Sequence, residues 1–483
     1  IKMMVGRLVV NGLTDEGVEY LHKFRNLSGN PQFYSLEMGT YFSLQMSWEN
    51  SIDEYLNYLS GRSPQFSIVS ERILSMPEDE NIQSMIRQKL ETSPLSDAKF
   101  ILSDLYFKNR EFKKAYDVLI SNHASDERLL KFGDDLLFVK EFDLADSVMN
   151  NILLTSKDEK VLESAIFKIA QIYEDRTLRS LNLLPISGLF RGNQFFASPF
   201  LRIDESQSLA IYKAMSIYDS LKTVTNSIEA AFKLGEIRFR ALNDLDGAEN
   251  QFNELILISG THPFKLKSFI RTIDILLAKG DLSGAETKIT DALKNSSFVR
   301  SLGRDANSEL EMKLMQVYFY EGKLEELDSL SAIMMKNLPS GNDRVNDILE
   351  LSGLSISLKN NEDFFNQFAE VQLKIHQNKR TEAIRSLQEL TEIEKSPNLG
   401  LVYYQYAQLL LLQGETSRTL EMLDLIPGDS PYASLGLIMK GEVEDYILND
   451  LSTSIDTYLL FLEKYPDSIY YDDIRMRLRE LAS

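Results

Sequence analysis

The chain has 483 residues, with 72 aspartates and glutamates against 52 lysines and arginines, so its formal net charge is 52 − 72 = −20. Cysteine is absent, which excludes disulfides, thiolate metal sites and cysteine nucleophiles. The four histidines (His22, His123, His262 and His376) form no HxxxH or HExxH pair, so we expect neither a metal nor a cofactor. The negative charge opposes binding to phosphates, so we expect no nucleic-acid partner.

Membrane-spanning and targeting segments are not evident. No uncharged apolar run approaches the ~18 residues that a membrane-spanning helix needs. The numbering begins at Ile1, which is compatible with a removed signal peptide, lipid anchor or tag. The lack of a targeting segment therefore does not indicate the cytosol.

One spacing of small and apolar residues recurs along the chain. Its copies begin at Met38, Leu102, Phe132, Leu234, Ile273, Tyr406 and Lys440. Within a copy, apolar positions at i, i+3 or i+4 and i+7 predict two helices, each with one buried stripe. Polar pairs such as Lys279-Gly280 predict the turn between the two helices. The copies beginning at Leu234 and Lys440 are one residue longer in the turn.

The spacing is irregular in two places. The interval between the copies at Met38 and Leu102 predicts a further helix pair, over 66–75 and 80–91. Beyond Leu338 the steps lengthen, and we expect irregular helices over 344–358, 362–377 and 380–394. This change predicts a division near residue 338, with an N-terminal array over 1–338 and a C-terminal array over 339–483.

The repeated spacing resembles the tetratricopeptide repeat family over roughly residues 31 to 475. The resemblance implies an all-α, right-handed solenoid of about ten helix pairs, whose stacking buries a core that no single pair can form. The last copy ends in Tyr465-Pro466-Asp467-Ser468, which is similar to repeats of bacterial envelope proteins such as the BamD-type lipoproteins and the periplasmic cell-division coordinator. That similarity implies a periplasmic or outer-membrane-associated location rather than a cytoplasmic one.

The resemblance also implies a binding groove. In this family, residues one and five positions beyond the small residue of the first helix line the groove. The first of these positions fall on Thr40, Asp104, Asp134, Gln171, Glu236, Asp274, Gln316, Gln408 and Glu442, and the second include Leu44, Lys108, Phe138, Arg240 and Tyr320. The Asn and Lys/Arg pattern with which chaperone-binding members hold a terminal carboxylate is missing. We expect this acid- and glutamine-lined groove to bind a basic or polar protein segment, although solvated acids need no ligand.

An insertion interrupts one copy. A helix over 161–174 is followed by residues 176–204 before the next helix, over 205–221, and connections of such length are often functional. The insertion offers a second candidate binding surface, made by Leu189, Phe190, Arg191, Phe195, Phe196, Phe200 and Arg202. Two alternatives remain: the phenylalanines pack back onto the solenoid, because exposing them is costly, or the loop touches a membrane surface peripherally.

Catalytic motifs do not occur: GxGxxG, GxxxxGK[ST] and GxSxG are absent. The sequence therefore predicts a non-catalytic scaffold or adaptor that works within a complex and docks other proteins on its groove and insertion. One alternative is an envelope assembly or secretion-complex component. Another is an enzyme whose carboxylates act in a pocket made by the insertion, which requires two acids, or an acid and a histidine, facing one closed pocket.

Overall fold

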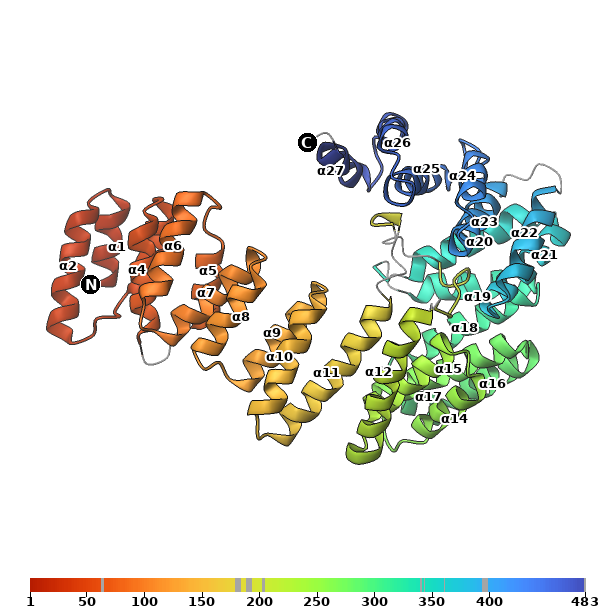
Figure 1. Cartoon of the computed structure of the whole chain (residues 1–483), viewed down its shortest axis with the longest axis horizontal. Coiled ribbons are helices and arrows are strands. Elements are labelled where there is room, and N and C mark those ends of the chain that lie inside the picture. Colours follow the sequence, from red (N-terminus) through yellow and green to blue (C-terminus); the bar gives the residue numbers. More distant parts are fainter. Residues whose placement is uncertain are drawn as a thin grey trace. The chain divides into compact units, whose positions relative to one another are not determined.

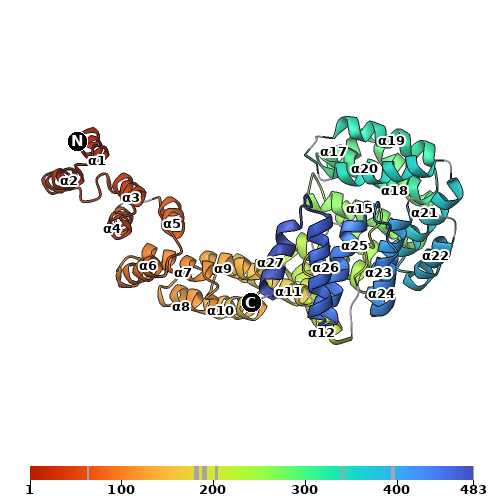
Figure 2. The same ribbon diagram turned by 90° about the horizontal axis from the view of Figure 1, so that it is seen from above.

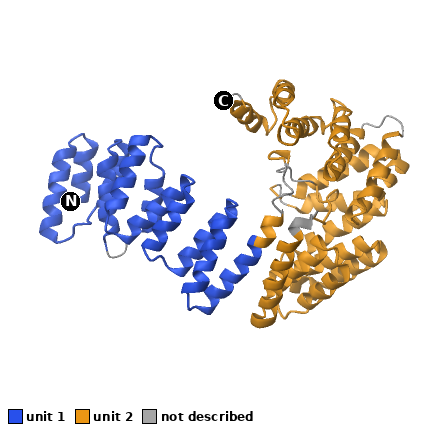
Figure 3. Cartoon of the chain, viewed as in Figure 1, with its two compact units in different colours: residues 1–172 blue, residues 173–483 orange. Residues whose placement is uncertain are grey.

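All regular elements that the computed structural model describes are helical. The described residues are 1–61, 65–178, 184–187, 193–201, 205–338, 341–342, 344–359, 361–392 and 398–481. They form helices α1 to α27 and two π-helical segments, η3 and η4 (Figure 1). The predicted all-α helical-repeat solenoid is confirmed. Contacts divide the chain into unit 1, residues 1–172, and unit 2, residues 173–483 (Figure 3).

Unit 1 consists of helices that pack mainly on their neighbours in sequence. Its helices are α1 (Lys2–Val10), α2 (Thr14–Ser28), α3 (Ser35–Leu44), α4 (Trp48–Leu59), α5 (Phe66–Leu74), α6 (Glu80–Thr92), α7 (Ser96–Lys108), α8 (Phe112–Ser121), α9 (Asp126–Phe138), α10 (Phe142–Thr155) and the first part of α11 (Glu159–Leu178). The pair predicted over 66–75 and 80–91 is therefore confirmed as α5 and α6.

Unit 2 continues the helix pairs and adds a short extra helix, α17. Its elements are α12 (Glu205–Thr225), α13 (Ile228–Glu236), η3 (Ile237–Ala241), α14 (Leu245–Ile256), α15 (Pro263–Lys279), α16 (Leu282–Lys294), α17 (Ser296–Leu302), α18 (Ala306–Tyr320), α19 (Leu324–Asn337), α20 (Arg344–Leu358), α21 (Glu362–His376), α22 (Arg380–Glu392), α23 (Leu399–Gln413), α24 (Thr416–Asp424), α25 (Ala433–Glu442), η4 (Val443–Ile447), α26 (Leu451–Lys464) and α27 (Tyr471–Leu481). Figure 2 shows α25, α26 and α27 side by side, in agreement with their contacts.

Small residues let the two helices of a pair approach closely. A Cβ atom added to Gly39 in α3 would lie 2.5 Å from the ring of Tyr55 in α4. A Cβ added to Gly441 in α25 would lie 2.6 Å from the ring of Tyr458 in α26. Both distances are far below van der Waals contact, so the recurring small residue is needed to seat a large side chain of the second helix.

The two copies with one additional residue contain π-helical turns. In η3 the backbone N–H of Leu242 donates to the carbonyl of Ile237, and in η4 that of Leu448 donates to Val443, five residues earlier in each case. A π-turn absorbs one inserted residue within a helix, which explains the longer spacing. Such turns concentrate at functional sites.

The irregular region beyond residue 338 forms α20, α21 and α22, at the bounds that the sequence predicts to within two residues. The division of the chain differs from the predicted one, because contacts separate residues 1–172 from 173–483 and not 1–338 from 339–483. One core cluster passes through residue 338 without a break: Leu327 and Met334 of α19 belong to the same cluster as Ile348 and Leu351 of α20.

Candidate functional site

Four of the five acids predicted to line the groove are bound by a cation from the next helix pair, and Glu174, three residues after the predicted Gln171, is bound in the same way. These register positions lie on the first helix of each pair, and we call that side of a unit its inner face. The ion pairs are Asp104 with Arg128 at 3.4 Å, Asp134 with Lys168 at 2.7 Å, Glu174 with Lys233 at 3.0 Å, Glu236 with Arg271 at 2.5 Å and Asp274 with Lys313 at 2.6 Å. We call this series the ion-pair ladder.

The ladder changes the interpretation of the predicted groove. An acid that already has a cation within ion-pair distance offers little net charge to a basic segment of another protein. Asp134 is exposed and its pair is weak, whereas Asp274 is 1% exposed and wholly dependent on its protein partners. The acids therefore join neighbouring helix pairs, and the charge argument for a basic partner loses its basis.

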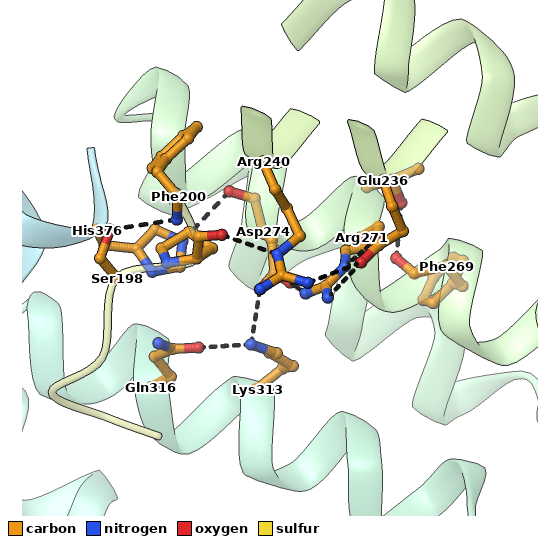
Figure 4. A network of polar contacts seen from close by, with 12 residues as sticks. Ser198, Phe200, Glu236, Arg240, Phe269, Arg271, Asp274, Lys313, Gln316 and His376 are labelled. Atoms are coloured by element: carbon orange, nitrogen blue, oxygen red, sulfur yellow. Dashed lines mark hydrogen bonds and ion pairs between the residues drawn. The ribbon is translucent and has the colours of Figure 1, made fainter. Parts of the chain in front are cut away.

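In unit 2 the ladder widens into a buried polar network (Figure 4). The Asp274 carboxylate binds both Lys313 and, at 2.8 Å, Arg271. Lys313 also donates to the Gln316 side-chain oxygen at 2.8 Å. The His376 ring nitrogen Nε2 lies 3.3 Å from the carbonyl oxygen of Asp274. Four elements, α13, α15, α18 and α21, are joined by these contacts and by the Glu236–Arg271 pair.

The network fixes the charge states of its members. Burial lowers the pKa of His376 to about 4, so the imidazole is neutral at neutral pH. Burial opposes ionisation of Asp274, but Lys313 and Arg271 outweigh it and lower the pKa of that carboxyl to about 2. General acid–base catalysis requires a group that gains or loses a proton near the working pH. Neither Asp274 nor His376 does so near neutral pH.

The other predicted groove residues have separate environments. Thr40 accepts a hydrogen bond from Arg72. Gln316 is buried and donates to the Tyr320 hydroxyl at 2.9 Å. Gln171 is half-buried, and Gln408 is exposed. Glu442, at the end of α25, is fully buried. The structure thus brings Glu236, Asp274 and Gln316 together and leaves the other predicted residues apart from them.

Glu442 holds part of the insertion. The described residues of the insertion, 184–187 and 193–201, are called here the inserted segment, and in Figure 1 the helices of unit 2 curve around it. The backbone N–H of Ser187 donates to the Glu442 carboxylate at 2.7 Å, and the Ser187 hydroxyl and the backbone N–H of Ile186 donate to it as well. Burial raises the pKa of Glu442, although these hydrogen bonds favour the ionised form.

The later part of the inserted segment is held in the same way. The side chain of Gln194 donates to Asp347 of α20 at 3.0 Å. Arg240, in η3, donates through Nε to the Pro199 carbonyl at 3.1 Å, and its own carbonyl accepts the backbone N–H of Leu201 at 2.8 Å. The hydrogen bonds to the inserted segment therefore come from the two π-helical regions. Arg240 of η3 binds residues 199–201, and Glu442, directly before η4, binds residues 186–187.

The phenylalanines of the inserted segment lie in the interior of unit 2. Phe195 is 0% exposed and belongs to the main core cluster, and Phe200 is buried against Phe239 at 5.1 Å between ring centroids. Phe196 packs edge-on against Phe319 at 5.9 Å and Phe368 at 5.8 Å. Phe195 and Phe200 are therefore not part of an exposed binding surface but pack back onto the solenoid, as the alternative expected, and Phe196 is half-buried against the same core. Leu189, Phe190, Arg191 and Arg202 lie outside the described residues.

Sequence reasoning missed the cations of the ladder, Glu174, and Asp347, which binds the inserted segment, and it named Glu442 as a groove residue but not as a partner of the insertion. A weak signal for the former is the basic residue that precedes the groove position on the same helix by three residues, as Arg271 precedes Asp274. Within the described ranges there is no cluster of three or more histidine, aspartate or glutamate side chains suited to a metal ion. In that same part of the chain, no helix combines the length and the apolar character needed to cross a bilayer.

Comparisons with known proteins give a likeness of fold only. No protein-family model and no curated protein matches the chain. A tetratricopeptide repeat protein from Parabacteroides merdae is 12% identical, with 62% of this chain and 91% of that chain covered and a TM-score of 0.33. The pentatricopeptide repeat protein PPR10 from maize is 12% identical, with 98% and 72% covered and a TM-score of 0.39. The human IFIT1 dimer with PPP-AAAA is 11% identical, with 84% and 87% covered and a TM-score of 0.27.

Proposed function

We propose that this protein is a non-catalytic scaffold that binds segments of other proteins on its helical repeats. The observation that carries the proposal is the set of hydrogen bonds and ring contacts by which the helices hold the inserted segment. Its main chain is bound by Glu442 and Arg240, its side chains by Asp347, and its aromatic rings fill spaces between helices. An inner face that holds an extended stretch of its own chain has the groups needed to hold such a stretch from a partner.

A stacked array suits this function for a physical reason. The helices are ordered before a partner arrives, so the entropy cost of binding falls mainly on the partner segment. In unit 2 the inner face is already filled where the inserted segment lies, so a partner binds elsewhere on the repeats. The net charge of −20 favours a protein over a nucleic acid as that partner.

The enzyme alternative requires an acid and a histidine at one accessible place. Asp274 and His376 do lie together, but both are buried, and the pKa values of about 2 and about 4 keep their charges constant near neutral pH. Their carboxylate and imidazole groups act in holding α15, α18 and α21 together. A structural role therefore accounts for the whole network.

A finer proposal places the scaffold in an assembly or secretion complex of a bacterial envelope, at the periplasmic or outer-membrane side. Its support is the Tyr465–Ser468 motif at the end of α26, which forms a turn through a hydrogen bond from Ser468 N–H to the Tyr465 carbonyl at 3.1 Å. Fractionation of the native cell tests this placement: recovery of the protein in the cytoplasmic fraction would contradict it.

Crosslinking with mass spectrometry in the native source tests the scaffold function. We expect crosslinks from lysines on the helices to one recurrent set of partner chains. Each partner is then purified and titrated against the full chain by calorimetry, with nuclease treatment as a control for bridging nucleic acid. Saturable binding at a fixed stoichiometry supports the scaffold. Failure of every crosslinked partner to bind the purified chain would refute it.

A further inference from the structure

Three tight turns of unit 1 carry large side chains in a backbone conformation that favours glycine. Met46, Arg110 and Lys140, each between the two helices of a pair, have φ values of 58°, 60° and 66°. In unit 2 the corresponding positive-φ positions are occupied by glycine or asparagine only: Asn243, Gly280, Gly322, Asn378, Gly414 and Asn449. Left-handed backbone is strained for side chains other than glycine, asparagine and aspartate, and such strain concentrates at functional sites.

The same edge of unit 1 contains a hollow. It lies between the pairs α7–α8 and α9–α10 and has a volume of about 1180 Å³. Phe107 and Phe112 form an aromatic side of it, with ring centroids 4.9 Å apart, and Leu144 lines it as well. Phe138, at the end of α9, stands at the hollow with 88% of its surface exposed. Single exposed apolar side chains are common, but Phe138 adjoins the apolar lining of the hollow, and contiguous apolar surface of this kind marks interaction sites.

Charged groups of both signs surround this apolar hollow, and two cations near it have no ion-pair partner among the described residues. Its lining contains four basic and three acidic residues, and two of the basic ones are paired with acids outside the hollow, Lys108 with Glu78 and Lys113 with Asp117. Glu111 is neutralised by Lys114 within the lining. Arg110 lines the hollow and Lys140 lies beside it, and neither forms an ion pair with any residue in the described ranges. These two cations, on strained turns, are available to a partner.

We propose that this hollow is a docking site for a segment of a partner protein that carries an aromatic or large aliphatic anchor next to acidic residues. The anchor packs on Phe107, Phe112 and Phe138, and the acids pair with Arg110 and Lys140. The inference rests on the proposed scaffold function and names the partner's chemistry. It reverses the expectation of a basic partner, because the acids of the inner face are held in the ladder while these cations are not.

A protein segment fits the hollow better than a nucleic acid does. Bases stack on exposed aromatic rings beside cations, so a single strand also has some of the required chemistry. A nucleic acid, however, brings one phosphate for each base, and the repulsion from a net charge of −20 opposes it. An apolar hollow lined by three phenylalanines and a leucine is filled best by an apolar side chain.

The test selects the ligand without prior choice of its sequence. Random twelve-residue peptides displayed on phage are panned against the immobilised full chain, and enriched peptides are synthesised and titrated by fluorescence anisotropy. We expect the enriched peptides to combine an aromatic or leucine residue with two or more acids. Phe138→Ala and Arg110→Glu should each weaken their binding at least tenfold, and raising salt should weaken it further. Leu154→Ala is the matched control, since Leu154 of α10 is 87% exposed and does not line the hollow.

Arg110→Gly separates binding from folding. Glycine adopts φ of 60° without strain, so this variant should melt at the same temperature as the native chain or higher and yet bind the peptide at least fivefold more weakly. Basic consensus sequences, peptides insensitive to both Phe138→Ala and Arg110→Glu, or no enrichment at all would overturn the proposal. A single-stranded oligonucleotide that binds and is lost with Phe138→Ala would also overturn it. Peptides that bind elsewhere would leave the scaffold function standing.

Discussion

Replacing Phe195 with alanine should destabilise unit 2 by about 3–5 kcal/mol and leave unit 1 unchanged. Phe195 belongs to the inserted segment, yet it is 0% exposed and lies in the main core cluster of unit 2. Truncation removes the buried ring and leaves a cavity that the rigid helices around it fill only in part. The prediction therefore asks whether the insertion is a working part of the core.

The expected shift in melting temperature follows from the size of the unit. Unit 2 spans residues 173–483. An unfolding entropy of roughly 2.1 cal/mol/K for each residue gives ~0.65 kcal/mol/K for the unit, so 3–5 kcal/mol corresponds to ~5–8 °C if the unit unfolds in one step. Phe138→Ala makes the same chemical change at an exposed site and should cost less than about 0.5 kcal/mol.

Trp48 allows the two units to be followed separately. It is the only tryptophan of the chain and lies half-buried at the start of α4, so its fluorescence reports on unit 1. Far-ultraviolet circular dichroism reports on all helices. In urea, Phe195→Ala should move the dichroism transition to lower concentration while the fluorescence transition stays in place. The core role of the insertion would be refuted if the free energy of unfolding from the dichroism transition fell by less than about 1 kcal/mol, or fell equally for Phe195→Ala and Phe138→Ala.

Three further predictions concern the network, the ladder and the helix contacts. Because burial lowers the pKa of His376 to about 4, this side chain binds a proton in the unfolded chain but not in the folded chain between pH 6.5 and 4. The free energy of unfolding of unit 2 should therefore fall by on the order of 3 kcal/mol as pH drops through that window. In urea titrations, His376→Gln should reduce this dependence of stability on pH. Lys313→Met should cost about 3 kcal/mol or more, because its aspartate partner is buried, whereas Lys168→Met should cost less than about 1 kcal/mol in the same assay. Gly235→Ala should cost about 1–3 kcal/mol, since the added Cβ would lie 2.7 Å from an aromatic ring, whereas Gly353→Ala, in open space within α20, should raise stability by up to about 1 kcal/mol; melting curves compare the two.

The helices were predictable from the sequence because their signals are local. Periodicity and turn residues lie within the element they specify, and the helices over 344–358, 362–377 and 380–394 end within two residues of the observed bounds. Even the longer spacing after Gly235 and Gly441 had a local cause, since each additional residue is taken up by a π-turn.

The ladder was not predictable because its partners belong to different helix pairs. The cation lies 24 residues after the acid for Asp104, 34 after Asp134 and 39 after Asp274. This variable separation hides which acid a cation binds, although Lys168, Lys233, Arg271 and Lys313 each precede a groove position by three residues. The residues predicted to line the groove do lie on the first helix of each pair, and four of the five acids among them already have a cation partner.

The insertion shows a second limit of local reasoning. Its composition is compatible with an exposed binding loop and with a buried one, and only the three-dimensional position of α18, α20 and α25 decides between them. Phe195 and Phe196 find their neighbours more than a hundred residues later in the chain. No pattern within residues 176–204 indicates which distant residues these side chains contact.

The bond between Glu442 and Ser187 spans 255 positions of the sequence, and this separation has a consequence for how the protein folds. Unit 1 is built mainly of contacts between helices close in sequence, so its structure can grow stepwise from the N-terminus during synthesis. Unit 2 cannot be completed until α25 has been made and has met the residues before α12. We therefore expect a late, slow closing step in unit 2, governed by high contact order, with Leu184, which shares a core cluster with Met439 and Val443, exposed to aggregation until it occurs.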